Sequence, residues 1–169
     1  MRVPPGKTTI HVQSGFRKKH VTIEREFKTA DFHELPIRLD DCVLPPEFGK
    51  LVSADLHVHM NYGGHYRSTP ETLLAQQDAE DLDVVYNLLV NKEERIPDIS
   101  YFKSGGAADT ASGKRLLFHA QEFHTSFWGH LGLLNLRDHY ITPDFSAYRH
   151  TAMASPWPHN GVIPDLAHA

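Results

Sequence analysis

The chain has 169 residues, a formal net charge of −4 and 40% hydrophobic residues. This length and composition indicate one domain with a packed core and a small appendage. No stretch of about 18 apolar residues occurs, so we expect no membrane span. Cys42 is the only cysteine, which excludes an intrachain disulfide and a zinc cage built from thiolates.

Charge and the first residues restrict the partners and leave the compartment open. Basic residues concentrate before Thr29, and the net acidic remainder argues against a nucleic-acid groove. We expect Arg17 to His20 to form a solvated loop or hairpin tip rather than a phosphate-binding patch. No apolar signal-peptide core follows Met1. The natural start could precede this residue, and secretion or a periplasmic location would then be compatible with the sequence.

Residues 1–49 have the composition of a β-rich segment. Residues 8–13 and 20–25 alternate polar and apolar side chains, which predicts two strands joined by a turn. A third short strand is expected at 37–39, and the prolines within 44–49 predict a linker. We therefore expect residues 1–49 to be the end of a small β-sandwich or a hairpin cap on the following domain.

Residues 50–169 have the pattern of an α/β domain. A strand over 51–60 precedes a helix with Thr69 as N-cap and Pro70 in its first turn, and a strand over 83–90 follows. Strand, helix and strand in this order predict a βαβ unit with parallel strands.

Two further strands are expected at 116–125 and 129–136. Four strands in a β/α pattern are too few to close a barrel, and an open sheet of this size would expose its edges. We therefore expect the chain to be part of a longer protein, so that it holds only a portion of its second domain.

The strand around Ser53–Met60 carries the most informative residues. Successive side chains of a strand point to opposite faces, so Asp55, His57 and His59 are expected on one face and apolar residues on the other. Burying such groups without partners costs about 2–7 kcal/mol for each neutral group. A divalent metal removes that cost, because imidazole and carboxylate are ligands for zinc, manganese and iron. The pattern predicts a metal site that begins on this strand.

Further ionisable residues follow the ends of the neighbouring strands. Sites in α/β folds form at the carboxyl ends of the strands, so these groups are expected to meet at one rim. The candidate metal ligands are His57, His59, His65, Glu122 and His130. His124 is a candidate either for the metal or for a supporting position beside it.

Several short motifs occur in the second part of the chain. They are D-L-H-V-H at 55–59, a histidine at 65 after a glycine-bearing loop, T-P-E at 69–71, A-E-D-L-D-V-V at 79–85, and Q-E-F-H with G-H-L-G-L-L within 121–134. These motifs resemble the PHP (polymerase and histidinol phosphatase) family of metal-dependent phosphoesterases. M-N-Y-G-G-H-Y-R, N-K-E-E-R-I-P-D and E-F-H-T-S-F-W-G-H-L resemble the subgroup named for carbaryl hydrolase, the CehA/McbA type.

The resemblance implies a fold, a cofactor and a reaction. The fold would be a distorted β/α barrel of the PHP type, present here in part, with one or two divalent ions of Zn, Mn or Fe. The reaction would be hydrolysis of a small-molecule phosphoester, or of a carbamate, ester or amide, by metal-activated water. Asp55 would orient a histidine, and His124 and Lys92 would stabilise charge on the substrate. Asn91 stands where most members have a T-D-H triplet, which argues against a three-metal site.

Three other interpretations remain open. An amidohydrolase-type barrel also begins with H-x-H on its first strand, but its bridging lysine and later aspartate are not identifiable here. A degenerate, non-catalytic metallohydrolase module, structural or interacting, is favoured by the missing T-D-H triplet. A polysaccharide-binding or surface-binding role for residues 1–49 is weakened by their few aromatic residues.

Overall fold

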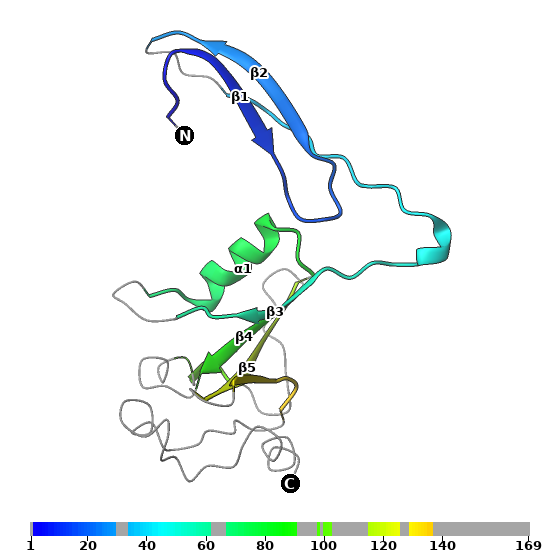
Figure 1. Cartoon of the computed structure of the whole chain (residues 1–169), viewed down its shortest axis with the longest axis vertical. Helices are drawn as coiled ribbons and strands as arrows, with labels where there is room; N and C mark the ends of the chain where they lie inside the picture. The colour runs from blue at the N-terminus through cyan, green and yellow to red at the C-terminus, as the bar shows by residue number, and fades with distance from the viewer. Residues whose placement is uncertain are drawn as a thin grey trace.

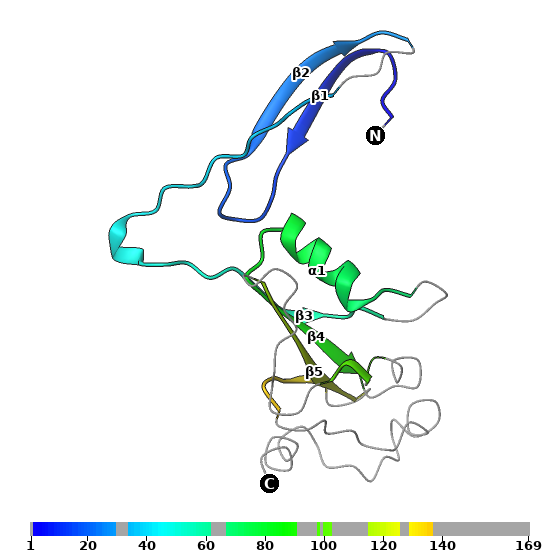
Figure 2. The same cartoon turned by 180° about the vertical axis from the view of Figure 1, so that it is seen from behind.

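The structure is a computed structural model that describes residues 2–29, 34–61, 67–90, 98, 100–102, 115–125 and 129–136. Within these ranges the chain is mostly β-structure, with two separate sheets and one α-helix. Figures 1 and 2 show the two sheets from opposite sides, connected by an extended linker.

The first sheet is an antiparallel hairpin of β1 (Gly6–Val12) and β2 (Val21–Phe27). Exposed and half-buried residues alternate along both strands, as the two-residue period requires. Ile10 lies opposite Ile23 in the ladder, so apolar side chains pair on one face. The two predicted strands are confirmed, whereas residues 37–39 form no strand.

The second sheet begins with a βαβ unit, as predicted. The linker includes a short 3-10 helix, Pro46–Phe48, and leads to β3 (Ala54–Val58), α1 (Pro70–Ala79) and β4 (Val84–Val90). The Thr69 side chain accepts a hydrogen bond from the backbone N–H of Thr72, which caps the helix, and Pro70 occupies the first helical position. β3 and β4 pair in parallel.

Two more strands complete the described sheet in the order β3-β4-β5-β6. β5 (Leu116–Thr125) runs parallel to β4, and β6 (Gly129–Leu133) returns antiparallel to β5. The predicted fold class, α/β in the form of a partial distorted β/α barrel of the PHP type, is therefore wrong. The described chain is β-rich, with a curled sheet of four strands and a single α-helix.

The connection between β5 and β6 explains this error. Only residues 126–128 separate Thr125 from Gly129 in the sequence. A parallel crossover needs roughly a dozen residues or more, whereas an antiparallel return needs only a few. The spacing therefore excluded a helix between these two strands, and the β/α alternation could not continue.

Helix α1 covers one face of the sheet and forms the main described core. Leu73 and Leu74 of the helix pack with Met60, Val85 and Leu117, all of them at most 8% exposed. On the opposite face, neighbouring residues in register are Tyr86 with Phe118, Leu88 with Ala120, and Val90 with Glu122. Glu122 therefore lies on the face that α1 does not cover.

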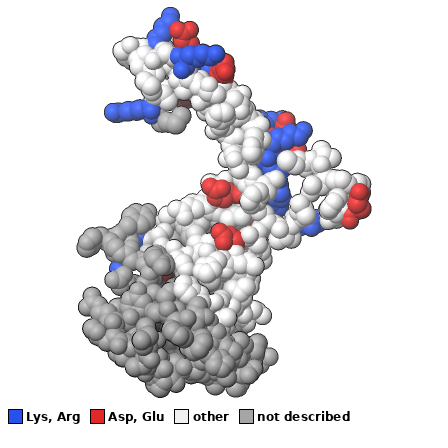
Figure 3. Space-filling model, in the orientation of Figure 1, with Lys and Arg blue, Asp and Glu red and all other residues white. Residues whose placement is uncertain are grey.

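At the amino ends of the parallel strands, a network of charges ties the hairpin to the sheet. Arg17, from the turn between β1 and β2, donates to both carboxylate oxygens of Asp81 and to both of Asp83. Arg115 pairs with the same two carboxylates. The guanidinium of Arg17 lowers the pKa of Asp81. Figure 3 shows Lys and Arg side chains in blue on the hairpin and at its end near the sheet.

This network corrects the expectation of a solvated basic loop. The residues do form the turn of a hairpin, but the Arg17 side chain is only 24% exposed and is bonded on several sides. Gly15 has a positive φ of 58° and lies against the backbone of Glu80, where a Cβ would not fit. The turn therefore docks closely onto the end of α1.

Within the described ranges, none of the helical structure combines the length and the apolar character that a membrane crossing requires. This agrees with the absence of a long apolar stretch in the sequence.

Candidate metal site

The edge strand β3 contains an irregularity that sets the direction of its side chains. Asp55 pairs with Val85 and Val58 with Asn87, so β3 has one more residue than β4 between the two pairs. An extra residue of this kind is a β-bulge, which bends a strand and re-aims its side chains. The Asp55 carboxylate accepts a hydrogen bond from the backbone N–H of His57 at 3.0 Å. The regular alternation that placed Asp55 beside the two histidines is therefore interrupted, and its carboxylate supports the backbone of His57.

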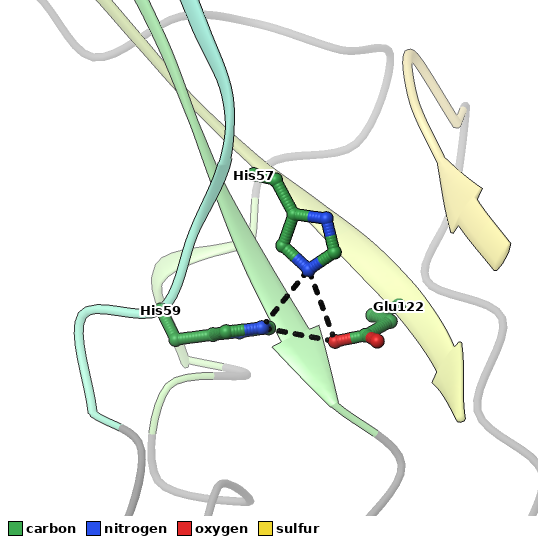
Figure 4. Close-up of side chains that lie close together, drawn as sticks. All are labelled: His57, His59 and Glu122. Carbon is green, nitrogen blue, oxygen red and sulfur yellow. Dashed lines mark hydrogen bonds and ion pairs between the residues drawn. The ribbon is translucent and has the colours of Figure 1, made fainter. Parts of the chain in front are cut away.

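Two histidines and one glutamate converge at the carboxyl ends of β3 and β5. His57 Nε2 lies 3.2 Å from His59 Nε2 and 3.5 Å from Glu122 Oε2. His59 Nε2 lies 3.0 Å from the same carboxylate oxygen. Figure 4 shows the three side chains pointing toward one common point from the two strands. Within the described residues, these three form the cluster of histidine and acidic groups with the spacing of a metal site.

The hydrogen bond of His59 to the neighbouring strand fixes which nitrogen faces the cluster. His59 Nδ1 lies 2.8 Å from the backbone carbonyl oxygen of Leu88, which can only accept. Nδ1 therefore carries the hydrogen, and a neutral ring presents its lone pair at Nε2. Metal-bound histidines commonly have this arrangement, with the second ring nitrogen donating to a backbone carbonyl.

Glu122 is the buried member of the cluster, with a side chain only 2% exposed. Burial acts to raise its pKa. When the His59 ring is protonated, its hydrogen bond and positive charge, together with the charges of His130 and His57, outweigh burial and lower the pKa of Glu122 to about 2. Glu122 is therefore an anion at neutral pH, as a metal ligand must be.

The spacing of the three atoms matches the size of a divalent metal. Ligand atoms about 2.1 Å from a metal lie about 3.4 Å apart in a tetrahedral site and about 3.0 Å apart in an octahedral one. The observed separations of 3.0, 3.2 and 3.5 Å span these two values. A lone pair on His59 Nε2 and the carboxylate would repel each other at this distance, and a cation, either a proton or a metal, relieves that repulsion.

His130 reaches the same carboxylate from β6. Its Nδ1 lies 2.6 Å from Glu122 Oε1, an ion-pair distance without the alignment of a hydrogen bond. Because β6 is antiparallel, its first residues lie beside the last residues of β5, and His130 pairs in register with His124. The sequence prediction that His57, His59, Glu122 and His130 meet at one rim agrees with this geometry.

The other predicted site residues do not take part in this cluster as described. His65 and Lys92 lie outside the described residues. The backbone of His124 belongs to β5, and its side chain is not among those described. Asp55 is exposed and bonds the His57 backbone instead of an imidazole ring.

Two asparagines that no sequence motif singled out hold the chain after β3. Asn87, fully buried in the middle of β4, accepts a hydrogen bond from the backbone N–H of Met60 at 2.8 Å. Asn61 bonds the backbone of Ser68 through both ends of its amide and donates to Asp98 at 2.6 Å. A lone asparagine within the apolar run V-V-Y-N-L-L-V was the available signal, because a buried amide requires partners.

Comparisons with protein-family models, with curated proteins and with solved structures find no match to this chain.

Proposed function

We propose that His57, His59 and Glu122 bind a divalent metal ion, and that the protein is a metal-dependent hydrolase. The observation that carries the proposal is the convergence of His57 Nε2, His59 Nε2 and Glu122 Oε2 within 3.5 Å of one another. The tautomer that the Leu88 carbonyl imposes on His59 is a second support, because it directs a lone pair into the cluster.

The donor set restricts the metal. Two imidazoles and one carboxylate suit zinc, manganese and iron, and they are poor ligands for calcium, which prefers oxygen alone. A second ion has a possible position at the other oxygen of the carboxylate, Glu122 Oε1, which faces His130. One or two ions are therefore compatible with the described residues.

A metal at this site supplies hydrolytic chemistry, because it lowers the pKa of water to near 7 and polarises a phosphoryl or carbonyl oxygen. The chain contributes the charge and the orientation. Glu122 provides a buried negative charge, and its burial keeps the ion in a medium where electrostatic effects are strong. His57 is 54% exposed, so one side of the cluster is open to a small-molecule substrate. A phosphoester is the first substrate class to test, and the motif resemblance adds carbamates, esters and amides.

Activity tests the proposal directly. The whole chain, freed of metal and reloaded with Zn²⁺, Mn²⁺ or Fe²⁺, is assayed with a chromogenic phosphate ester and a naphthyl carbamate at pH 7–9. We expect metal-dependent turnover of one substrate class, which the paired substitution His57→Ala/His59→Ala abolishes. The control is the pair His11→Ala/His20→Ala, which removes two exposed histidines of the hairpin region.

The same assay separates the rival interpretations. Turnover that persists in His57→Ala/His59→Ala would contradict the assignment. Tight metal binding without turnover of either substrate would support the non-catalytic module. A reaction that requires dioxygen would indicate oxidative iron chemistry, since two histidines and a carboxylate also bind oxygen-activating iron.

A further inference from the structure

Asn87 is a buried polar residue of β4, and His119 and Gln121 of β5 are buried on the same face of the sheet. Asn87 lies at the centre of β4 with no exposed surface, on the face that α1 covers. An unpaired amide in such a place costs several kcal/mol, on the order of 2–7. A buried asparagine is therefore expected to have a specific task for both ends of its side chain.

Both ends of the Asn87 carboxamide are bonded. Oδ1 accepts from the backbone N–H of Met60 at 2.8 Å, and Nδ2 donates to His119 Nδ1 at 3.1 Å. The Met60 N–H can only donate, so the oxygen must face Met60 and the nitrogen must face His119. The orientation of the amide is thus fixed by its two partners.

The bond to Met60 lies where the strand ladder stops. The last register pair between β3 and β4 is Val58 with Asn87, and His59 and Met60 come after it. Beyond this pair, the Asn87 side chain binds the backbone of Met60, and the next residue of β4, Leu88, binds the ring of His59. Two successive residues of β4 thus hold two successive residues that follow β3.

We infer that Asn87 is a positioning residue for the metal site. By holding the Met60 N–H, it keeps the chain after Val58 close to β4, where the His59 ring reaches the Leu88 carbonyl. In that position Nε2 of His59 faces Glu122 Oε2 at 3.0 Å. The inference rests on the proposed function in so far as it concerns metal binding, and Asn87 itself contacts neither the cluster nor a substrate.

Substitution of Asn87 tests the metal side of this inference. Asn87→Leu, which is similar in size and cannot accept from Met60, is expected to weaken Zn²⁺ binding by the whole chain about tenfold, the usual range for outer partners of a site. Asn87→Asp keeps an acceptor for the Met60 N–H and is expected to restore most of the affinity. The absorption spectrum of the Co²⁺-loaded protein should change in Asn87→Leu and be close to wild type in Asn87→Asp.

Gln77 provides a matched control for loss of stability. It is also a buried carboxamide, 1% exposed, and donates to the Leu116 carbonyl at the opposite end of β5. Gln77→Leu is expected to lower stability without changing the affinity for Zn²⁺. Equal loss of affinity in Gln77→Leu and Asn87→Leu would overturn the inference, because the effect would then be general destabilisation.

A measurement on the metal-free chain keeps the inference separate from the proposed function. In the nuclear magnetic resonance spectrum, His59 should be the Nδ1–H tautomer in the wild type and in Asn87→Asp, and a mixture of tautomers in Asn87→Leu. An unchanged His59 tautomer in Asn87→Leu would overturn the positioning role. If the wild type binds no Zn²⁺, the proposed function fails, and the tautomer still decides the role of Asn87.

Discussion

The two ends of the parallel strands β3, β4 and β5 carry clusters of charge with opposite character. At the amino ends, Arg17 and Arg115 face the carboxylates of Asp81 and Asp83, so donors meet acceptors directly. At the carboxyl ends, the Nε2 atoms of two imidazoles converge on one buried carboxylate oxygen instead. The first cluster completes itself and contributes to stability. In the proposed function, the second cluster would be completed by a metal cation.

We expect substitutions at the amino ends to change mainly the free energy of unfolding, and substitutions at the carboxyl ends to change mainly the affinity for Zn²⁺. The largest effect is expected from Asp81→Ala, which removes the shared partner of Arg17 and Arg115. It should lower the free energy of unfolding by about 3 kcal/mol, because it leaves two half-buried guanidinium groups short of an acceptor. Urea unfolding measures the loss, and Zn²⁺ affinity should remain at the wild-type value.

Asp81→Asn is the matched variant at this position. Asparagine keeps the size of the side chain and tolerates the positive φ of 54°, so the charge and one of the two acceptor oxygens are lost. It should lose less stability than Asp81→Ala. Weaker Zn²⁺ binding in either variant would show that the two ends are coupled.

Glu122→Gln should produce the complementary result at the carboxyl end. Loss of the buried carboxylate is expected to weaken Zn²⁺ binding at least about 100-fold, or about 2.7 kcal/mol. The metal-free stability at neutral pH should fall as well, because the contacts that lower the pKa of Glu122 favour its ionised form over a neutral side chain. Calorimetric titration and urea unfolding of the same sample separate the two quantities. A large loss of metal-free stability with intact Zn²⁺ binding would reverse the roles of the two ends.

Gly15→Ala is a smaller test of the amino end. The new methyl group would contact the Glu80 backbone and Asp81, so the hairpin turn must shift from α1. We expect a loss of about 2 kcal/mol in unfolding free energy. Gly49→Ala is the control, because Gly49 has a similar φ of 62° and open space around its Cβ position. Equal losses in both variants would attribute the effect to backbone strain alone and not to docking of the turn.

Lowering the pH is expected to have the smallest effect on stability, and it acts on carboxylates at both ends of the parallel strands. The folded-state pKa of Asp81 and of Asp83 is lowered from 3.8, and that of Glu122 from 4.5 to about 2. A lowered carboxyl pKa gives stability that is fully present above the unfolded value and is lost as the pH falls through the folded value. Wild-type stability should therefore decline from about pH 5 downward, and Glu122→Gln should decline less steeply. Urea unfolding measured across this pH range gives the free energy of unfolding of both proteins. The same slope of this free energy against pH in the two proteins would contradict the prediction.

The sequence was most informative where the signals are local. Thr69 and Pro70 mark the start of α1 by their own chemistry, and the period of two marks β1 and β2. The proximity of the candidate ligands could be predicted because residues at the carboxyl ends of the parallel strands must lie at one edge of a sheet. His57, His59 and Glu122 therefore come together although more than sixty positions separate the histidines from the glutamate.

The other features of the fold and of the candidate site depend on contacts that no local sequence pattern encodes. Arg17 donates to Asp81, which lies 64 positions later in the sequence, and no residue near Arg17 in the sequence indicates that partner. The bulge in β3 shifts Asp55 relative to His57, because the register with β4 decides side-chain direction and is set by tertiary packing. The direction of β6, in contrast, was encoded in the short spacing between Thr125 and Gly129, and the barrel prediction overlooked it.

The central claim is that His57, His59 and Glu122 form a metal centre, and a calorimetric Zn²⁺ titration of the metal-free chain tests it most directly. We predict about one tightly bound equivalent for the wild type and for His11→Ala/His20→Ala, and none for His57→Ala/His59→Ala, with a folded circular-dichroism spectrum in all three. The same stoichiometry and affinity in His57→Ala/His59→Ala as in the wild type would contradict the claim.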